Sequence, residues 1–585
     1  MQPNGALAGS RPAREVGWLS ALEERVAALE PRAVLVPMLV LQWLTLVAFV
    51  LVVRHNGWVF YQGGDETFYY SDAWSIAHRH IPESEIGFAW SYLLSPVALV
   101  AGSNFFSALP ALIVLQTVVL MPVALFCVYG IAARIGGRLL GYLAAALWVL
   151  GPYAAIPLWD HRYHPKYVEQ FLPQALGLTG LADYASMVCV LCAAYLCMRV
   201  LDEGAWVDGA LAGVAAGFAI AIKPANALFL AGPLLAFAAA RRFRSGAVFG
   251  AAIAPALAAL ALWKLKGLGH LPFLTPAPKA LAAGAGAFGA GDLPLGLVVN
   301  RYFHFDWWRM HRNYLELREF FWSTRLLQWL PLAGFLAAAR RSWPKALLLA
   351  GWMGAFVLVK GSSNQASVES GILLRLFLPG FPPFLVFTAL IPLLLPTVGP
   401  RLWQRFPVRT RAIRWRAPWV LGTVAVFAAI PVALFLALPP LRAHAVVKYF
   451  DENVVVPVDD GFAVHVGRGG GGELVRWNPP ASAAGTHVFY RVYRSRPTVQ
   501  APDLTLPPGR EGIRCLPLTT YGRAGAVDCR VEMTYLGSTR AHSFVDKPPA
   551  GPWTYRIGLA SNWLNDTSLG DVVLFSGPGR LSRFH

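Results

Sequence analysis

The chain of 585 residues is 56% hydrophobic and 14% charged, with a mean hydropathy of +0.48. This balance excludes an ordinary soluble domain, and apolar runs of about twenty residues predict membrane-spanning helices rather than the short alternating strands of an outer-membrane barrel. The net charge of +18 requires no nucleic-acid partner, because many basic residues occupy short loops where they orient the chain against membrane lipids.

The N-terminal segment 1–32 is charged and precedes the first apolar run without a small-residue cleavage site. We therefore expect a retained first span and a cytoplasmic N-terminus, with residues 14–30 forming an amphipathic helix at the membrane surface. A catalytic membrane domain is expected over 33–439, as an α-helical bundle with about eleven transmembrane helices. The spans are expected near 33–53, 107–133, 139–158, 182–199, 206–222, 225–240, 246–265, 326–339, 344–359, 372–395 and 418–438.

The connecting loops are asymmetric in charge and length. Short loops on one side carry Arg134, Arg138, Arg241, Arg242, Arg244, Arg340, Arg341, Lys345 and the basic stretch 401–416. Lys and Arg concentrate in cytoplasmic loops, so this side is predicted to face the cytoplasm of a bacterium, with residues 440–585 on the outer face of the inner membrane. The longer loops, at 54–106, 159–181, 266–325 and 360–371, then face outward and are expected to carry the function.

Two adjacent carboxylates, Asp65 and Glu66, follow Gly63-Gly64 in the first outer loop. A solvated loop charge is the ordinary interpretation, but the glycine break and the aromatic residues that follow favour a catalytic carboxylate at the membrane surface. Asp65 is the first choice and Glu66 the fallback. On a surface helix Asp72 would share a face with Asp65, and we assign Asp72 and Tyr69 to the acceptor side of the site.

Basic side chains on the predicted outer side could bind an anionic substrate. They are His161, His164, Lys166, Lys223, Lys360 and Arg375. Arg375 is preferred as a phosphate ligand because its planar guanidinium matches phosphate oxygens bidentately. The alternative is that these side chains reach toward lipid headgroups. Two histidines three residues apart do not establish a metal site, so no cofactor is predicted and a divalent cation stays open.

The third long outer loop combines a glycine-rich stretch at 282–291 with an aromatic and basic block at 301–309. Trp307 and Trp308 in this block predict a mobile lid with an anchor at the membrane interface. An ordinary aromatic belt at headgroup level is the alternative.

Beyond residue 440 the sequence changes to short alternating strands separated by Pro and Gly turns. Residues 455–580 resemble a fibronectin type III or immunoglobulin-like sandwich, with Trp477, Tyr490 and Val492 as core residues and Tyr555 as a tyrosine corner. Cys515 and Cys529 are expected to form a disulfide in this exported domain. The other four cysteines lie in apolar segments and are expected to be small buried residues.

Three motifs together resemble the GT-C class of membrane glycosyltransferases, in particular protein O-mannosyltransferases and aminoarabinose-transferase-like enzymes. They are the Asp65-Glu66 pair, the glycine-rich segment 217–224 that ends in Lys223-Pro224, and the segment 375–383 that begins with Arg375. Leu376 stands where that class usually has tyrosine, so a ring contact from this position is not expected.

The resemblance implies an inverting transfer of a sugar from a polyprenyl-phosphate donor to a hydroxyl of a cell-envelope glycan, lipid or protein. Arabinose or mannose is the sugar we expect. One carboxylate then suffices as general base, because phosphate is already a good leaving group. A lipid or glycolipid flippase with an exported accessory domain is the alternative, and a non-enzymatic scaffold ranks last. The oligomeric state has no signature in the sequence.

Overall fold

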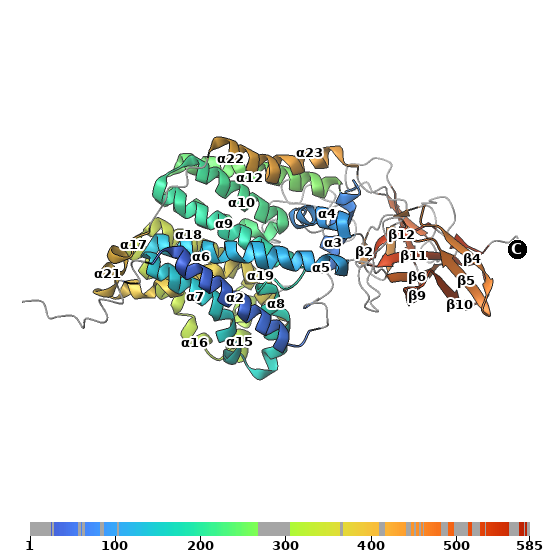
Figure 1. Ribbon diagram of the computed structural model, residues 1–585, viewed down its shortest axis with the longest axis horizontal. Coiled ribbons are helices and arrows are strands. Elements are labelled where there is room, and N and C mark those ends of the chain that lie inside the picture. Colours follow the sequence, from blue (N-terminus) through green and yellow to red (C-terminus); the bar gives the residue numbers. More distant parts are fainter. Residues whose placement is uncertain are drawn as a thin grey trace, which may run out of the picture.

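The structure is a computed structural model in which a helical body is followed by a β-rich region (Figure 1). It describes residues 25, 29–55, 60, 65–81, 87–101, 105–266, 305–362, 367–408, 416–439, 446–449, 452–454, 458–459, 461–480, 489–495, 513–517, 527–532, 534–560, 572–577 and 579–581. Most of the expected surface helix at 14–30, the Gly63-Gly64 break, the glycine-rich stretch at 282–291 and residues 301–304 lie outside these ranges.

The helical body is built mainly from α-helices, some of them joined by short 3-10 or π-helical turns. The helices are α2 (Pro31–Val52), α3 (Asp65–Ala77), α4 (Ala89–Ala101), α5 (Phe105–Val114), α6 (Met121–Gly136), α7 (Arg138–Ala154), α8 (Leu172–Ala175), α9 (Ala182–Glu203), α10 (Trp206–Ile222), α11 (Ala231–Ala239), α12 (Phe243–Lys266), α15 (Trp307–Phe320), α16 (Thr324–Leu327), α17 (Leu330–Arg341), α18 (Trp343–Gly361), α19 (Ile372–Phe377), α20 (Pro382–Leu390), α21 (Val398–Arg405), α22 (Ala417–Val424) and α23 (Ile430–Ala437).

Several of these helices are long and apolar enough to cross a membrane. Within the residues that the structure describes, six stretches qualify: Pro31–Val52, Ser107–Gly136, Ala182–Glu203, Phe243–Lys266, Trp343–Gly361 and Ala417–Ala437. The segments Ile372–Gly380 and Pro382–Leu394 meet at a bend of 60° and make a seventh if they form one broken span. The protein is therefore a helical multi-pass membrane protein. Helix occupies all eleven predicted ranges, but a count of eleven crossings is not confirmed.

Glycines on α10 let this helix approach α12 closely. A Cβ added at Gly213 would lie 2.3 Å from the carbonyl oxygen of Phe249, and one added at Gly217 would lie 2.9 Å from the Ala256 Cβ. Small residues at four-residue spacing are a common means of packing helices in membranes, where close van der Waals contact replaces the hydrophobic effect. The glycine-rich helix that the sequence singles out therefore has a packing role.

The basic residues predicted to share one side gather at one end of the helical body. Arg134 pairs with Asp202 at 2.9 Å, and Lys345 approaches the same carboxylate at 2.5 Å. Arg138 donates its backbone N–H to Phe406 O at 2.8 Å. The ends of α6, α9, α18 and α21 are thus tied together, in agreement with a common side for these loops. Its assignment to the cytoplasm stays a prediction.

The β-rich region consists of thirteen strands in the described residues. They are β1 (Val446–Tyr449), β2 (Glu452–Val454), β3 (Val458–Asp459), β4 (Val464–Gly469), β5 (Gly472–Trp477), β6 (Phe489–Ser495), β7 (Ile513–Pro517), β8 (Val527–Glu532), β9 (Thr534–Thr539), β10 (Ser543–Asp546), β11 (Thr554–Ala560), β12 (Val572–Ser576) and β13 (Gly579–Arg580). They form three sheets, ordered β10-β5-β4, β3-β12-β11-β6-β9 with β13 beside β11, and β2-β1-β8-β7.

The core of the β-rich region contains the residues predicted for it. Trp477, Tyr490, Val492 and Tyr555 are all buried, and the rings of Trp477 and Tyr490 meet edge to face with centroids 5.4 Å apart. The Tyr555 hydroxyl donates to the Asp546 carboxylate at 2.7 Å, whereas a tyrosine corner bonds to backbone. Three sheets and the parallel pairings of β3 with β12 and of β1 with β8 also depart from the predicted two-sheet sandwich, which is not confirmed.

Cys515 on β7 and Cys529 on β8 are direct partners in an antiparallel pair. Opposed residues in such a pair have Cα atoms about 4.5–5.5 Å apart, within the range that a disulfide can bridge. The backbone register therefore favours the disulfide, which stays a prediction.

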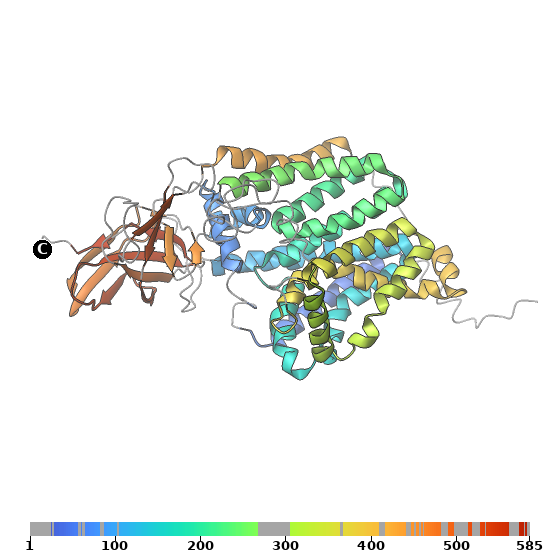
Figure 2. The same ribbon diagram turned by 180° about the vertical axis from the view of Figure 1, so that it is seen from behind.

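The β-rich region lies at the end of the helical body that carries α3, opposite the basic loops (Figures 1 and 2). Strand β12 contacts α3, and Ile81, just beyond α3, donates its backbone N–H to Pro439 O at 3.0 Å. The helix that begins with Asp65 therefore lies between the helical body and the β-rich region.

Candidate active site

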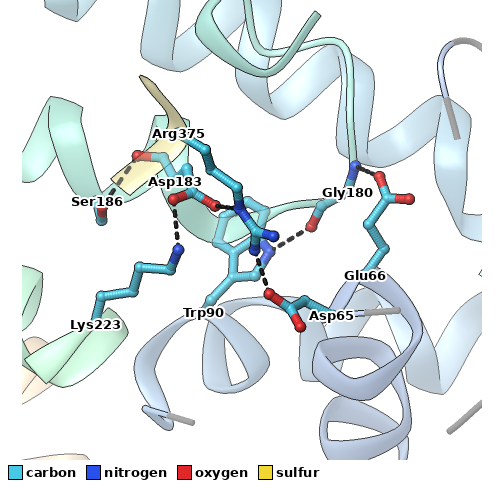
Figure 3. Close-up of polar contacts among 8 residues, drawn as sticks. All are labelled: Asp65, Glu66, Trp90, Gly180, Asp183, Ser186, Lys223 and Arg375. Carbon is cyan, nitrogen blue, oxygen red and sulfur yellow. Dashed lines mark hydrogen bonds and ion pairs between the residues drawn. The ribbon is translucent and has the colours of Figure 1, made fainter. Parts of the chain in front are cut away.

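Four charged side chains from distant parts of the chain meet at one place in the helical body (Figure 3). Asp65 is the first residue of α3, Asp183 lies in the first turn of α9, Lys223 follows the last residue of α10, and Arg375 lies on α19. We call Asp65, Arg375, Asp183 and Lys223 the charged cluster.

The charged cluster is a continuous chain of ion pairs. The Arg375 Nη2 donates to Asp65 Oδ2, and its Nε donates to Asp183 Oδ2 at 3.2 Å. Lys223 Nζ donates to the other oxygen of Asp183. Each oxygen of the Asp183 carboxylate thus binds one cation, while Arg375 bridges the two acids.

Burial varies strongly along this chain. The Asp183 side chain is only 1% exposed, whereas Lys223 and Arg375 are 19% and 24% exposed and Asp65 is 43% exposed. A buried ion needs partners, because burying an unpaired charge costs several kcal/mol per ion. Asp183 is therefore a fixed internal anchor, and Asp65 is the open end of the cluster.

Glu66 and Trp90 hold the backbone at the start of α9. The Glu66 carboxylate accepts the N–H of Gly180 at 2.6 Å, and Trp90 Nε1 donates to the carbonyl of the same residue at 2.9 Å. Both side chains are buried. Because Gly180 lies just before α9, these bonds fix where Asp183 points, and the N-terminal end of the helix dipole favours a carboxylate there.

The proline that follows Lys223 determines the position of this residue. A residue before proline avoids the helical conformation, and Lys223 is extended, with φ −137° and ψ 113°. Its carbonyl accepts the backbone N–H of Asn226, whose side chain donates to Ala219 O at 2.8 Å. The helix thus ends at Ile222, and the lysine side chain leaves it toward Asp183.

Arg375 lies on a short helix within the bent pair of segments. Gly371, with φ +78°, precedes α19, a backbone conformation that favours glycine. Beyond α19, Pro379 accepts a bond from Trp352 Nε1 at 2.8 Å. The segment 159–181 supports the residues before α19, since Tyr163 donates its hydroxyl to Val368 O at 2.5 Å and Lys166 donates to the backbone oxygen of Glu369.

The residues predicted to bind donor phosphate divide into two groups. Lys223 and Arg375 lie in the charged cluster, and Lys360 is near enough to Lys223 for their positive charges to repel each other. Among the described contacts, none joins His161, His164 or Lys166 to the cluster: His164 Nε2 lies 3.1 Å from Trp159 O, and Lys166 binds Glu369. A role for these three residues in donor binding stays a prediction.

The acceptor-side residues are less accessible than the sequence suggests. Asp72 and Tyr69 are both buried on α3. Burial, with repulsion from the carboxylates of Asp183 and Asp65, raises the pKa of Tyr69 well above its usual range. Its phenol therefore stays neutral and cannot serve as a base.

Trp307 and Trp308 begin α15 and are 65% and 75% exposed. Asp306 starts the helix by accepting the backbone N–H of Arg309 at 3.0 Å. Exposed tryptophans suit an interfacial anchor or an aromatic belt equally well, and their lid function stays a prediction.

Asp160, beside the two histidines of the segment 159–181, is already paired with an arginine. Side-chain hydrogen bonds from Arg162 hold the pKa of Asp160 below its usual range, so this carboxylate is ionised and already paired. Within the part of the chain that the structure describes, no group of three or more His, Cys, Asp or Glu side chains is arranged to hold a metal ion.

Asp183 is the member of the site that sequence reasoning missed. The signal was present, because an acidic residue begins an otherwise apolar span, and ionisable residues in membrane segments are expensive and usually paired. The cations Lys223 and Arg375 were recognised by the same rule, but their common acidic partner was not.

Comparisons with known proteins show only a distant likeness. The sequence matches no family model and no curated protein. Among solved structures, the oligosaccharyltransferase AglB of Archaeoglobus fulgidus, in complex with an inhibitory peptide and a dolichol-phosphate, is similar at a TM-score of 0.37 and 16% identity, over 69% of this chain and 55% of that one.

Two further structures of an oligosaccharyltransferase from the same organism are similar to the same degree. The apo form has a TM-score of 0.37 and 16% identity over 70% of this chain and 56% of that one. The complex with zinc and sulfate has 0.35 and 14%, over 70% and 53%. This chain thus spans about half the length of these proteins.

Proposed function

We propose that the protein is an inverting glycosyltransferase that uses a polyprenyl-phosphate sugar on the outer face of the membrane. The observation that carries the proposal is the charged cluster, in which a partly exposed carboxylate, Asp65, pairs with Arg375, and the buried Asp183 holds both Arg375 and Lys223. A general base next to phosphate-binding groups is the minimum that such a transfer needs.

In this reaction Asp65 is the general base. Its carboxylate takes the proton of the acceptor hydroxyl while the hydroxyl oxygen bonds to the anomeric carbon. The bond from that carbon to the donor phosphate oxygen breaks, its electron pair leaves with the phosphate, and the carbon is inverted. The phosphate charge changes from about one to two negative units, so cations on the leaving-group side stabilise the transition state.

The charge of the site supports an anionic lipid. Arg375, Lys223 and Lys360 supply three positive charges, and Asp65 and Asp183 supply two negative ones. These cations come from three different helices or helix ends, so an anionic phosphate could contact more than one of them, while the Glu66 carboxylate is directed to Gly180 N–H. Arg375 is the cation with a planar fork for phosphate oxygens.

The acceptor is proposed to reach Asp65 from the side of the β-rich region. Strand β12 contacts α3, so a glycan, lipid or protein held by this region would be close to the base. Tethering of this kind raises the local acceptor concentration without new contacts in the catalytic site.

The test is sugar transfer in proteoliposomes, from a panel of radiolabelled polyprenyl-phosphate sugars to an envelope extract. Because general-base assistance contributes about 10²–10⁴-fold, Asp65→Asn should lower transfer by at least about 10²-fold. Glu319→Gln, which removes an exposed carboxylate outside the cluster, is the control and should retain transfer. Equal transfer by wild type and Asp65→Asn would contradict the assignment of the base.

A lipid flippase is the second candidate, and the broken helix favours it. Discontinuous membrane helices with charges near the break are typical of transporters, and Arg375 lies beside the 60° bend. Lipid movement across the bilayer by wild type and by Asp65→Asn, with no sugar transfer by either, would support the flippase and contradict the transferase.

A further inference from the structure

Arg375 bridges two carboxylates through different parts of its guanidinium. Nε, next to the side-chain stem, binds Asp183, and Nη2, at the tip, binds Asp65 (Figure 3). The stem contact involves an acid that is 1% exposed, and the tip contact one that is 43% exposed. The same arginine therefore has one buried and one open partner.

The two contacts differ in what it costs to break them. Removing one member of a buried ion pair is strongly destabilising, because the other charge stays buried. A partly exposed carboxylate regains water when its partner leaves, and pairs at the surface contribute little to stability. An arriving anion should therefore displace Asp65 from Arg375 and leave Asp183 in place.

We propose that the donor phosphate replaces Asp65 as the partner of the Arg375 Nη groups, while Asp183 stays bound to Nε. No covalent bond changes in this step: the Nη groups exchange one oxyanion for another. The Asp65–Arg375 pair is then a resting contact, and Asp65 becomes free to accept the acceptor's proton only after the donor is bound. Asp183 is a positioning residue that acts through Arg375.

This exchange rests on the proposed function and adds an order of events to it. A base that is free only in the donor complex would limit proton abstraction when no sugar is ready for transfer. The contrasting arrangement is a permanent brace, in which the Asp65–Arg375 pair ties α3 to α19 in every state. Phosphate binding would then be insensitive to Asp65 except through charge repulsion.

The experiment is equilibrium binding of a radiolabelled polyprenyl phosphate without sugar to the full chain in nanodiscs. Asp65→Asn removes the competing carboxylate and should tighten binding about tenfold, a change within the range of coupled neighbours. Arg375→Gln should weaken binding. In the Arg375→Gln background, Asp65→Asn should change the affinity by less than about twofold, because the competition no longer exists.

Each alternative gives a different pattern. If Asp65→Asn tightens binding equally with and without Arg375, the effect is simple charge repulsion and the exchange is overturned. Unchanged or weaker binding by Asp65→Asn would also overturn the exchange. Arg375→Lys replaces Arg375→Gln if the latter does not fold, since one ammonium cannot bind Asp183 and phosphate as the guanidinium fork does. Asp202→Asn breaks a similar partly exposed pair, with Arg134 at the other end of the molecule, and should leave binding unchanged.

The binding measurement needs no sugar transfer, so the two proposals can fail separately. If the effect of Asp65→Asn on phosphate binding depends on Arg375 but no sugar is transferred, the exchange is supported and the transferase is contradicted. If sugar transfer depends on Asp65 but the effect of Asp65→Asn on phosphate binding does not depend on Arg375, the transferase is supported and the exchange is overturned.

Discussion

Asp65 and Glu66 are neighbours in sequence with carboxylates in different environments. Asp65 is partly exposed beside Arg375, whereas Glu66 is buried and accepts the N–H of Gly180 at 2.6 Å. Successive residues on a helix point in directions about 100° apart, so the pair cannot share one task here. The sequence predicts Glu66 as the fallback base, but its position suits a side chain that supports Gly180.

Substitutions at Glu66 should separate support from catalysis. Glu66→Ala leaves the buried N–H of Gly180 without this acceptor and should lower the free energy of unfolding by about 1–3 kcal/mol. Glu66→Gln keeps an acceptor oxygen, so we expect transfer within about tenfold of wild type. The measurements are thermal unfolding in detergent and transfer in proteoliposomes.

One result would contradict a purely supporting role for Glu66. A folded Glu66→Gln protein that loses transfer as completely as Asp65→Asn would make Glu66 part of the catalytic machinery. Support of Gly180 would then be only part of the role of Glu66.

At the level of elements, the glycines of α10 that contact α12 determine the position of Lys223. Gly213 allows the backbone of α10 to reach that of α12, with only 2.3 Å between an added Cβ and Phe249 O. Because real Cβ contacts are never this short, any larger residue must separate the two helices. Lys223 follows the last turn of α10, so a displaced helix would also move one cation of the charged cluster.

The glycine contact predicts a result opposite to helix propensity. Alanine normally stabilises a helix by about 1 kcal/mol relative to glycine, yet Gly213→Ala should lower the apparent melting temperature. Gly250→Ala on α12 is the matched control, because nothing lies within 4 Å of its added Cβ, and it should be neutral or stabilising. A melting temperature for Gly213→Ala at or above that of Gly250→Ala would show that the contact is not tight.

The whole molecule has two chemically distinct ends. One end joins basic loops through pairs such as Arg134 with Asp202, and the other carries α3, which begins with Asp65, next to the β-rich region (Figure 1). Since basic loops stay in the cytoplasm, this polarity predicts that the charged cluster faces outward, where lipid-linked sugars rather than nucleotide sugars are available.

Thiol labelling in intact cells tests this orientation. Val545→Cys on β10 and Phe243→Cys at the start of α12 replace exposed residues at the two ends. A membrane-impermeant maleimide should label the first in intact cells and the second only after permeabilisation. If only Phe243→Cys is labelled in intact cells, the topology is the reverse of the predicted one, which contradicts a polyprenyl-phosphate donor.

The sequence by itself determined the membrane class, the helical ranges and the β-rich C-terminal part, and it singled out Asp65, Lys223 and Arg375 as candidate site residues. These features depend on local composition, hydropathy and the cost of ions near hydrocarbon. Only the tertiary structure decided that Arg375 reaches Asp65 across 310 residues of sequence, that Asp183 anchors both cations, and that Glu66 turns away to Gly180. Such pairings depend on how helices pack, which no local pattern specifies.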